Sequence, residues 1–145
     1  MKKSTRTIVS ITLLLALSLF SCTKRSRYDE LSDRIIVLFQ QGQYPEAEKL
    51  AKEAVTIAKE TFGPNHAKTA ASLDTLAMIF CSQRNYEQAE PLYKETLAIM
   101  EKVSGPESPD LAHVLENMAG FYRTVGNEEE AERLTARLNK IRSNH

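Results

Sequence analysis

The 145-residue sequence has little of several residue types that mark specialised protein classes. It contains no Trp, 5 Gly, 5 Pro and 2 Cys, with 42% hydrophobic and 26% charged residues. The low Gly and Pro contents exclude collagen-like and low-complexity chains, and two cysteines are too few for a disulfide-stapled scaffold. The remaining profile is typical of one globular domain.

Positive charge is not in excess either, because 19 Lys and Arg are balanced by 19 Asp and Glu. A nucleic-acid binder needs surplus basic side chains to neutralise phosphates, so we expect no nucleic-acid partner. Common catalytic patterns are also missing, among them Gly-x-Ser-x-Gly, Cys-x-x-Cys and His-Glu-x-x-His. The histidines His66, His113 and His145 lie far apart in the sequence. We therefore expect no enzyme, no cofactor and no metal site.

The N-terminus has the three parts of a secretory signal. Three basic residues precede an apolar run over residues 8–20, and the small residues Ser21 and Cys22 follow. A bilayer core requires roughly 20 apolar residues, so this run is too short to span it. We predict that residues 1–21 are a signal peptide and that the protein is exported.

The end of this segment, Leu19-Phe20-Ser21-Cys22, resembles a bacterial lipobox. The resemblance implies that Cys22 becomes the first mature residue and receives acyl chains, which together anchor a protein firmly. Residues 22–27 are then the lipidated cysteine and a tether. The implied location is the bacterial cell envelope, on the periplasmic side of the outer membrane where two membranes exist. Ordinary signal cleavage without a lipid remains the alternative.

The rest of the chain repeats itself with a period of 42 residues. A shift by 42 residues brings four series into register: Gly42, Arg84 and Gly126; Ala47, Ala89 and Ala131; Leu50, Leu92 and Leu134; Ile57, Ile99 and Ile141. A period of this length indicates stacked structural repeats. We expect one domain over residues 28–145, with copies at about 28–69, 70–111 and 112–145.

Each copy is expected to contain two amphipathic helices. The first helix of the second copy has apolar residues at i, i+3, i+4 and i+7, namely Leu73, Leu76, Ala77 and Phe80. This spacing makes one apolar stripe on a helix. The second helices should begin at about Pro45, Glu87 and Glu128, each after a turn containing Gly or Asn. The alanines in register at 47, 89 and 131 should let the paired helices approach closely.

These features resemble the tetratricopeptide repeat. The family's pattern of hydrophobic, small, aromatic and Ala positions is matched by Leu73, Leu76, Ala77, Phe80, Tyr86, Ala89 and Tyr93. The 42-residue period and the segment Gly63-Pro64-Asn65-His66 are similar to the kinesin-light-chain type of repeat. The resemblance implies an all-α fold, a right-handed α-solenoid of three antiparallel helix hairpins. Its concave face, lined by the first helix of each hairpin, is expected to bind a peptide or helix.

The resemblance also implies which residues face this groove. They are Ile36, Phe39, Gln40, Asp74, Met78, Cys81, His113, Asn117, Gly120 and Arg123. Asn117 matches the asparagine that commonly bonds the backbone of a bound peptide in the family. Because Arg123 is the one cation beside it, we do not expect an acidic C-terminal tail as the ligand. An alternative is that Ile36 and Phe39 pack within the molecule.

The resulting prediction is a non-catalytic protein-binding scaffold, anchored to a membrane by lipidated Cys22, that acts in an envelope assembly complex. One alternative is a self-associating structural module, since Leu134, Leu138 and Ile141 of the last helix could form an apolar edge for homo-oligomers. Another is a secreted or cytosolic adaptor without a lipid anchor.

Overall fold

The computed structural model describes residues 23–144, which are helical apart from the connecting turns. The helices are the first helix, of which residues 23–40 are described, then α2 (Tyr44–Thr61), α3 (Ala67–Ser82), α4 (Tyr86–Ser104), α5 (Ala112–Thr124) and α6 (Glu128–Ser143), with the 3-10 helix η1 (Pro109–Leu111) before α5. The predicted signal peptide, Cys22 and His145 lie outside the described residues.

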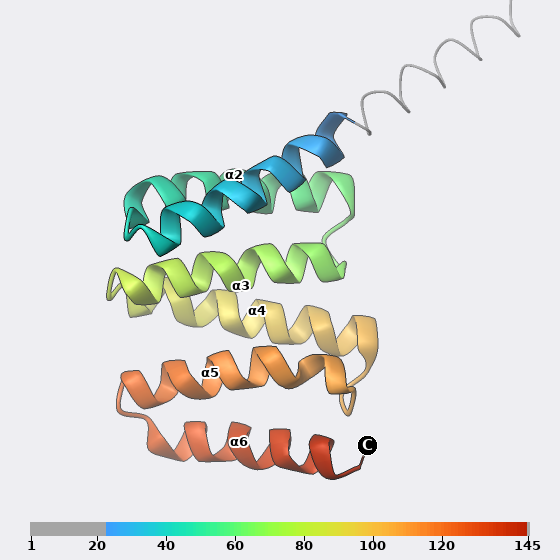
Figure 1. Cartoon of the computed structure of the whole chain (residues 1–145). Coiled ribbons are helices and arrows are strands. Elements are labelled where there is room, and N and C mark those ends of the chain that lie inside the picture. The colour runs from blue at the N-terminus through green and yellow to red at the C-terminus, as the bar shows by residue number, and fades with distance from the viewer. Residues whose placement is uncertain (1–22, 145) are drawn as a thin grey trace, which may run out of the picture.

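The helices form three antiparallel hairpins stacked in single file, from the first helix at one end to α6 at the other (Figure 1). The first helix pairs with α2, α3 pairs with α4, and α5 pairs with α6. The all-α class and the α-solenoid of three hairpins predicted from the sequence are therefore confirmed.

The turn within each hairpin repeats with the sequence period. Gly42, Arg84 and Gly126 all have positive φ, at 73°, 61° and 80°. This left-handed conformation is a common way to end a helix, and glycine adopts it without the steric penalty of a Cβ atom. The second helices begin at Tyr44, Tyr86 and Glu128, each within one residue of its predicted start. The 42-residue register thus describes the backbone as well as the sequence.

The connection between the first and second hairpins is held by its histidine. The Nδ1 atom of His66 accepts the backbone N–H of Lys68 at 3.1 Å, which caps the N-terminus of α3. The imidazole ring also stacks on Phe62, with 5.3 Å between the ring centroids. This histidine therefore has a structural role in the turn, where a cap satisfies an N–H group that has no partner within the helix.

The core of the stack is built from equivalent residues of the three copies. Two series in register are buried: Leu31, Leu73 and Leu115, and Ala47, Ala89 and Ala131. Each alanine is fully buried, which confirms that small side chains occupy these positions where the helices pack together. Burial of each leucine stabilises the fold by roughly 1.5–3 kcal/mol.

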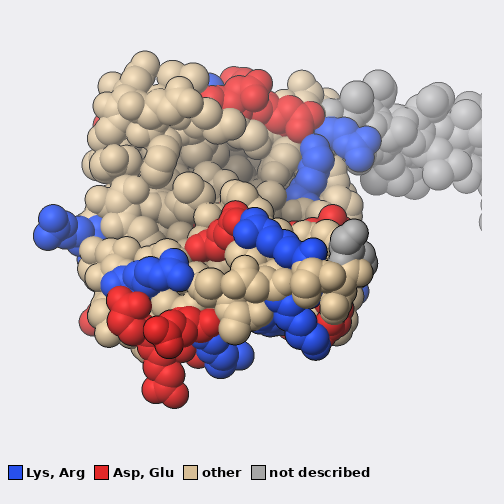
Figure 2. Space-filling view, turned by 60° about the horizontal axis from the view of Figure 1, so that its bottom comes forward, with Lys and Arg blue, Asp and Glu red and all other residues tan. Residues whose placement is uncertain are grey.

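The C-terminal end of the stack has a buried apolar stripe and a charged outer surface. Leu134, Leu138 and Ile141 are buried. Figure 2, in which this end comes forward, shows Lys and Arg side chains interspersed with Asp and Glu over it. Such a polar outer face is what the terminal helix of a solenoid requires. The apolar edge considered for homo-oligomers is thus covered within the chain at these three residues.

At the other end, the described part of the chain begins as a helix. Residues 23–27, predicted from the sequence to be part of a tether, are helical and continue into the first helix. Lys24 pairs with Glu60 of α2, and Arg27 pairs with Glu53 at 3.2 Å. Within residues 23–144, no helix has the length and apolar character needed to cross a bilayer.

Candidate functional site

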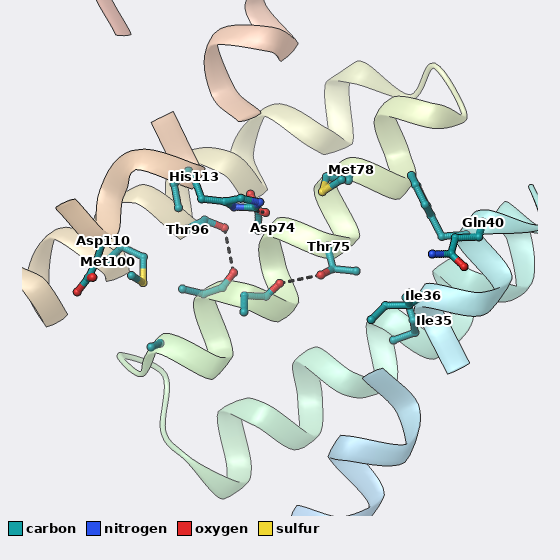
Figure 3. A pocket seen from close by; sticks show the side chains of 15 residues that line it. Ile35, Ile36, Gln40, Asp74, Thr75, Met78, Thr96, Met100, Asp110 and His113 are labelled. Atoms are coloured by element: carbon teal, nitrogen blue, oxygen red, sulfur yellow. Dashed lines mark hydrogen bonds and ion pairs between the residues drawn. The ribbon is translucent and has the colours of Figure 1, made fainter. Parts of the chain in front are cut away.

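A groove of about 610 Å³ runs between the first helix, α3 and α5 (Figure 3). Its lining residues come from three hairpins: Ile35, Ile36, Phe39, Gln40, Ala67, Ala70, Ala71, Asp74, Thr75, Met78, Thr96, Met100, Asp110, His113 and Val114. Small-molecule sites commonly have volumes of roughly 300–1,000 Å³. The groove is therefore large enough to receive several side chains of a partner.

Most of the groove wall is apolar, and part of it is exposed. The hollow in Figure 2 has mainly uncharged walls. Ile36 is 55% exposed, whereas Phe39 is half-buried and packs edge-on against Tyr44 with 5.5 Å between ring centroids. The alternative that both residues pack within the molecule thus holds in part for Phe39, while Ile36 is not covered by the described chain. An exposed apolar surface in a concave site is typical of a binding site.

Two hydroxyl groups in the groove are already used by the fold. The Thr75 hydroxyl donates to the backbone oxygen of Ala71 at 2.9 Å, and the Thr96 hydroxyl donates to the backbone oxygen of Ala70 at 3.4 Å (Figure 3). Both threonines therefore satisfy hydrogen bonds with the backbone of α3. They contribute little free polarity to the groove.

Asp74 of α3 has a different environment, because it is only 5% exposed. Its Oδ2 atom accepts a hydrogen bond from the Asn117 amide at 2.8 Å and lies 3.6 Å from Nδ1 of His113. Its Oδ1 atom is buried and has no hydrogen-bond partner among the described residues. Burial raises the pKa of Asp74, and the nearby His113 and the Asn117 hydrogen bond offset this rise in part.

The groove contains acidic groups and a histidine but no Lys or Arg. Asp74, Asp110 and His113 are its titratable lining residues. In the described part of the chain, no group of three or more His, Cys, Asp or Glu side chains is arranged to hold a metal ion. The two lining carboxylates are thus not opposed by a Lys or Arg side chain, which favours a cationic group over an anionic one in the groove.

Six of the ten residues predicted to face the groove line it: Ile36, Phe39, Gln40, Asp74, Met78 and His113. The other four lie elsewhere on the same helices. Cys81 is half-buried, with its Sγ atom 3.8 Å from the Tyr93 hydroxyl oxygen, and burial raises the pKa of the Cys81 thiol. Because a thiol with a raised pKa carries little thiolate, this environment does not activate Cys81 as a nucleophile.

The three remaining residues belong to α5. Asn117 donates its amide to Asp74, so its Nδ2 atom is engaged within the protein. Gly120 is exposed, and a Cβ atom added there would meet nothing within 4 Å. Arg123 donates to the Thr135 hydroxyl of α6 at 2.8 Å. Asn117 thus acts next to the groove by holding Asp74, while Arg123 contacts the last helix.

One part of the groove, the part that reaches α4, was not predicted from the sequence. Thr96 and Met100 lie there, beyond the small residues Ala67, Ala70 and Ala71 of α3. Because these alanines have short side chains, the space between α3 and its neighbours extends toward the second helix of the hairpin. The sequence feature that could have indicated this extension of the groove is the set of small residues at the beginning of α3.

Comparisons with known proteins agree with this architecture. The tetratricopeptide-repeat family model matches residues 31–102 and 75–137, while no curated protein matches the chain. The crystal structure of BtubC (BKLC) from P. vanneervenii has 26% identity and a TM-score of 0.75, covering 81% of this chain and 46% of that one. A putative kinesin light chain from Podospora anserina with nearly identical repeats has 25% identity and a TM-score of 0.68, covering 82% of this chain and 55% of that one.

This chain thus spans about half the length of each of these two structures. The tetratricopeptide-repeat domain of Arabidopsis FLU, with 16% identity and a TM-score of 0.71, covers 83% of this chain and 98% of its own length and shows the common fold. The repeat register, the stacked hairpins and the family match lead to one conclusion. The chain belongs to the tetratricopeptide-repeat family and is similar to the repeats of kinesin light chain.

Proposed function

We propose that this protein is a non-catalytic scaffold that holds a peptide or helix of a partner protein in its groove. The observation that carries the proposal is the apolar groove itself, with Ile36 exposed within it. Membership of the tetratricopeptide-repeat family supports the same role, because this fold generally serves protein–protein interaction without catalysis.

The energetic reason is burial of apolar surface in a site that is already formed. Each square ångström of apolar surface removed from water contributes roughly 25 cal/mol before the costs of association are subtracted. The walls of the groove belong to three packed hairpins and are already formed. The conformational entropy lost on binding would therefore be mainly that of the partner segment. Ile36 and Met78 on opposite helices offer apolar contacts to the same bound segment.

The chain offers a matched pair of variants to test this function. Ile36 lines the groove and is 55% exposed, whereas its neighbour Val37 is 50% exposed and is not a lining residue. Affinity capture with the full chain from its native envelope, followed by quantitative mass spectrometry, should recover a partner that Ile36→Ser loses and Val37→Ser keeps. Circular dichroism should show equal helical content in all three proteins. Equal capture by wild type and both variants would remove the groove as the binding surface.

We also propose that lipidated Cys22 anchors the scaffold in the bacterial cell envelope, at the periplasmic side of the outer membrane in cells with two membranes. The support is the lipobox-like sequence before Cys22, which directly precedes the described helix. An anchor raises the effective concentration of the groove near the membrane, so an affinity of about 1 μM could serve assembly of an envelope complex.

Labelled palmitate tests the anchor, and the second cysteine supplies the control. The label should enter the wild-type chain, persist in Cys81→Ala and disappear in Cys22→Ala. Absence of label from the wild type would contradict lipidation and favour a secreted or cytosolic adaptor. The outcome is independent of the groove, because neither substitution alters a lining residue.

A further inference from the structure

Asp74 is the one carboxylate among the buried residues of the described chain, where the other buried polar residues include Thr69, Ser72 and Thr96. Its neighbours in the groove are largely apolar. A carboxylate removed from water in such surroundings is unfavourable unless it is paired and fully hydrogen-bonded. Asp74 therefore represents a cost to the fold that packing alone does not explain.

The hydrogen bonds around Asp74 satisfy only one of its two oxygen atoms. Oδ2 is held by Asn117, which fixes the carboxylate against α5, while Oδ1 has no partner among the described residues. His113 lies 3.6 Å from Oδ2, on the side that is already bonded. Because buried polar atoms in native proteins are nearly always paired, an orphaned carboxylate oxygen in a groove points to a donor that arrives with a ligand.

The charges around the groove specify the kind of donor. No Lys or Arg is among the lining residues, and the second carboxylate, Asp110, lies at the same groove. An acidic ligand would bring a like charge close to Asp74, whereas a cation would pair with its carboxylate. The apolar side chains on either side, Ile36 and Met78, would cover the apolar part of the same ligand.

We propose that the groove binds a partner segment in which one Lys or Arg is flanked by large apolar residues, with the cation paired to Asp74. This inference rests on the proposed function, because it names the ligand chemistry of the same groove. Asp74 supplies specificity, and the apolar wall supplies most of the contact area. Asn117 is a positioning residue that holds the carboxylate toward the ligand.

Selection from a displayed library of random 12-residue peptides tests the proposal without a known partner. The full chain should enrich peptides that contain one Lys or Arg with large apolar neighbours. Synthetic copies of these peptides should bind Asp74→Asn about 10- to 100-fold more weakly than wild type, the loss expected for a charge-assisted hydrogen bond. Asp33→Asn is the matched control, and its effect should be below about threefold because this carboxylate is exposed on the first helix and does not line the groove.

Asparagine keeps an oxygen that can accept the Asn117 bond, so Asp74→Asn is expected to fold, and a thermal melt checks this. If the enriched peptides show no preference for Lys or Arg, or bind Asp74→Asn equally well, the cation proposal is overturned while groove binding stands. If no enriched peptide depends on Ile36, the proposed function itself fails. A dimer of the chain that Asp74→Asn dissociates in sedimentation would assign the groove to a second copy and also overturn the proposal.

Discussion

The two ends of the stack differ in how far their apolar side chains are buried. At the C-terminal end, α6 buries Leu134, Leu138 and Ile141 and places its charged side chains outside. At the N-terminal end, the first helix leaves Ile36 and Val37 about half exposed. One end of the molecule is thus closed by its own chain, and the other keeps apolar surface beside a groove.

The difference follows from how many faces of each helix are apolar. In α6 the apolar residues fall on one stripe, which packs within the third hairpin. The first helix has an inner stripe that includes buried Leu31 and Ile35, and a second pair of apolar residues beside it. The first helix therefore keeps apolar side chains that its own hairpin does not cover, and for this reason we propose the groove, not the C-terminal end, as the binding surface.

The largest expected effect on the free energy of unfolding is at the C-terminal end, which is closed by its own chain. Leu134→Ala should lower the free energy of unfolding by about 2–5 kcal/mol, because it opens a cavity at a fully buried position. Urea denaturation followed by circular dichroism measures this loss. A loss below about 1 kcal/mol, within the range of exposed positions, would mean that α6 is not an integral part of the core.

A smaller effect is expected at the buried carboxylate of the groove. Burial raises the pKa of Asp74 in the folded state, because surroundings removed from water disfavour the charged carboxylate. Its contribution to stability is then fully present below the unfolded pKa and is lost as the pH rises through the higher folded pKa. Asp74→Asn should therefore gain stability relative to wild type as the pH rises from 4 to 8.

Chemical denaturation at both pH values provides the measurement. A variant that is less stable than wild type at pH 8 would show that the charged carboxylate of Asp74 stabilises the fold. In that case Asp74 would not lower the stability of the fold. The groove side of the molecule would then not differ from the C-terminal end by containing a destabilising residue.

The turns of the outer hairpins provide a third contrast, because they contain glycine where the middle hairpin has Arg84. Arg84 has a φ of 61°, similar to those of Gly42 and Gly126. Arg84→Gly should raise stability by about 0.5–1 kcal/mol, since glycine adopts this conformation without a Cβ clash. Thermal unfolding measures the gain. A decrease in stability would mean that the three turns are not equivalent despite their matching register.

The smallest stability effect is expected at the open end. Ile36→Ser should change the free energy of unfolding by less than about 0.5 kcal/mol, because its side chain is 55% exposed. The same urea titration used for Leu134→Ala measures it. A loss comparable with that of Leu134→Ala would place Ile36 in the core and contradict an open groove.

The fold could be predicted from sequence because the same local rules recur three times. The register of Ala47, Ala89 and Ala131 reports a geometric constraint, since only small residues allow the helices to pack so closely. The residues in register at the turns, Gly42, Arg84 and Gly126, indicate a second constraint, because all three have the left-handed backbone conformation. Repetition in three copies made each of these weak signals specific.

The site could be predicted only in part, because it depends on contacts between copies. The resemblance to the tetratricopeptide repeat implied that Asp74 and Asn117 face the groove as separate polar residues, but their hydrogen bond joins two different hairpins. Neither periodicity nor spacing reports that Asp74 is buried or that one of its oxygens lacks a partner. The depth of the groove toward Met100 likewise depends on how the hairpins pack.

Photo-crosslinking inside the cell compares the two ends of the stack most directly. A photo-crosslinking amino acid is placed at position 36, in the groove, or at position 139, on the exposed surface of α6. After irradiation, we expect a covalent adduct with a partner protein from position 36 and none above background from position 139. An adduct from position 139 together with none from position 36 would contradict the claim that the groove is the interaction surface.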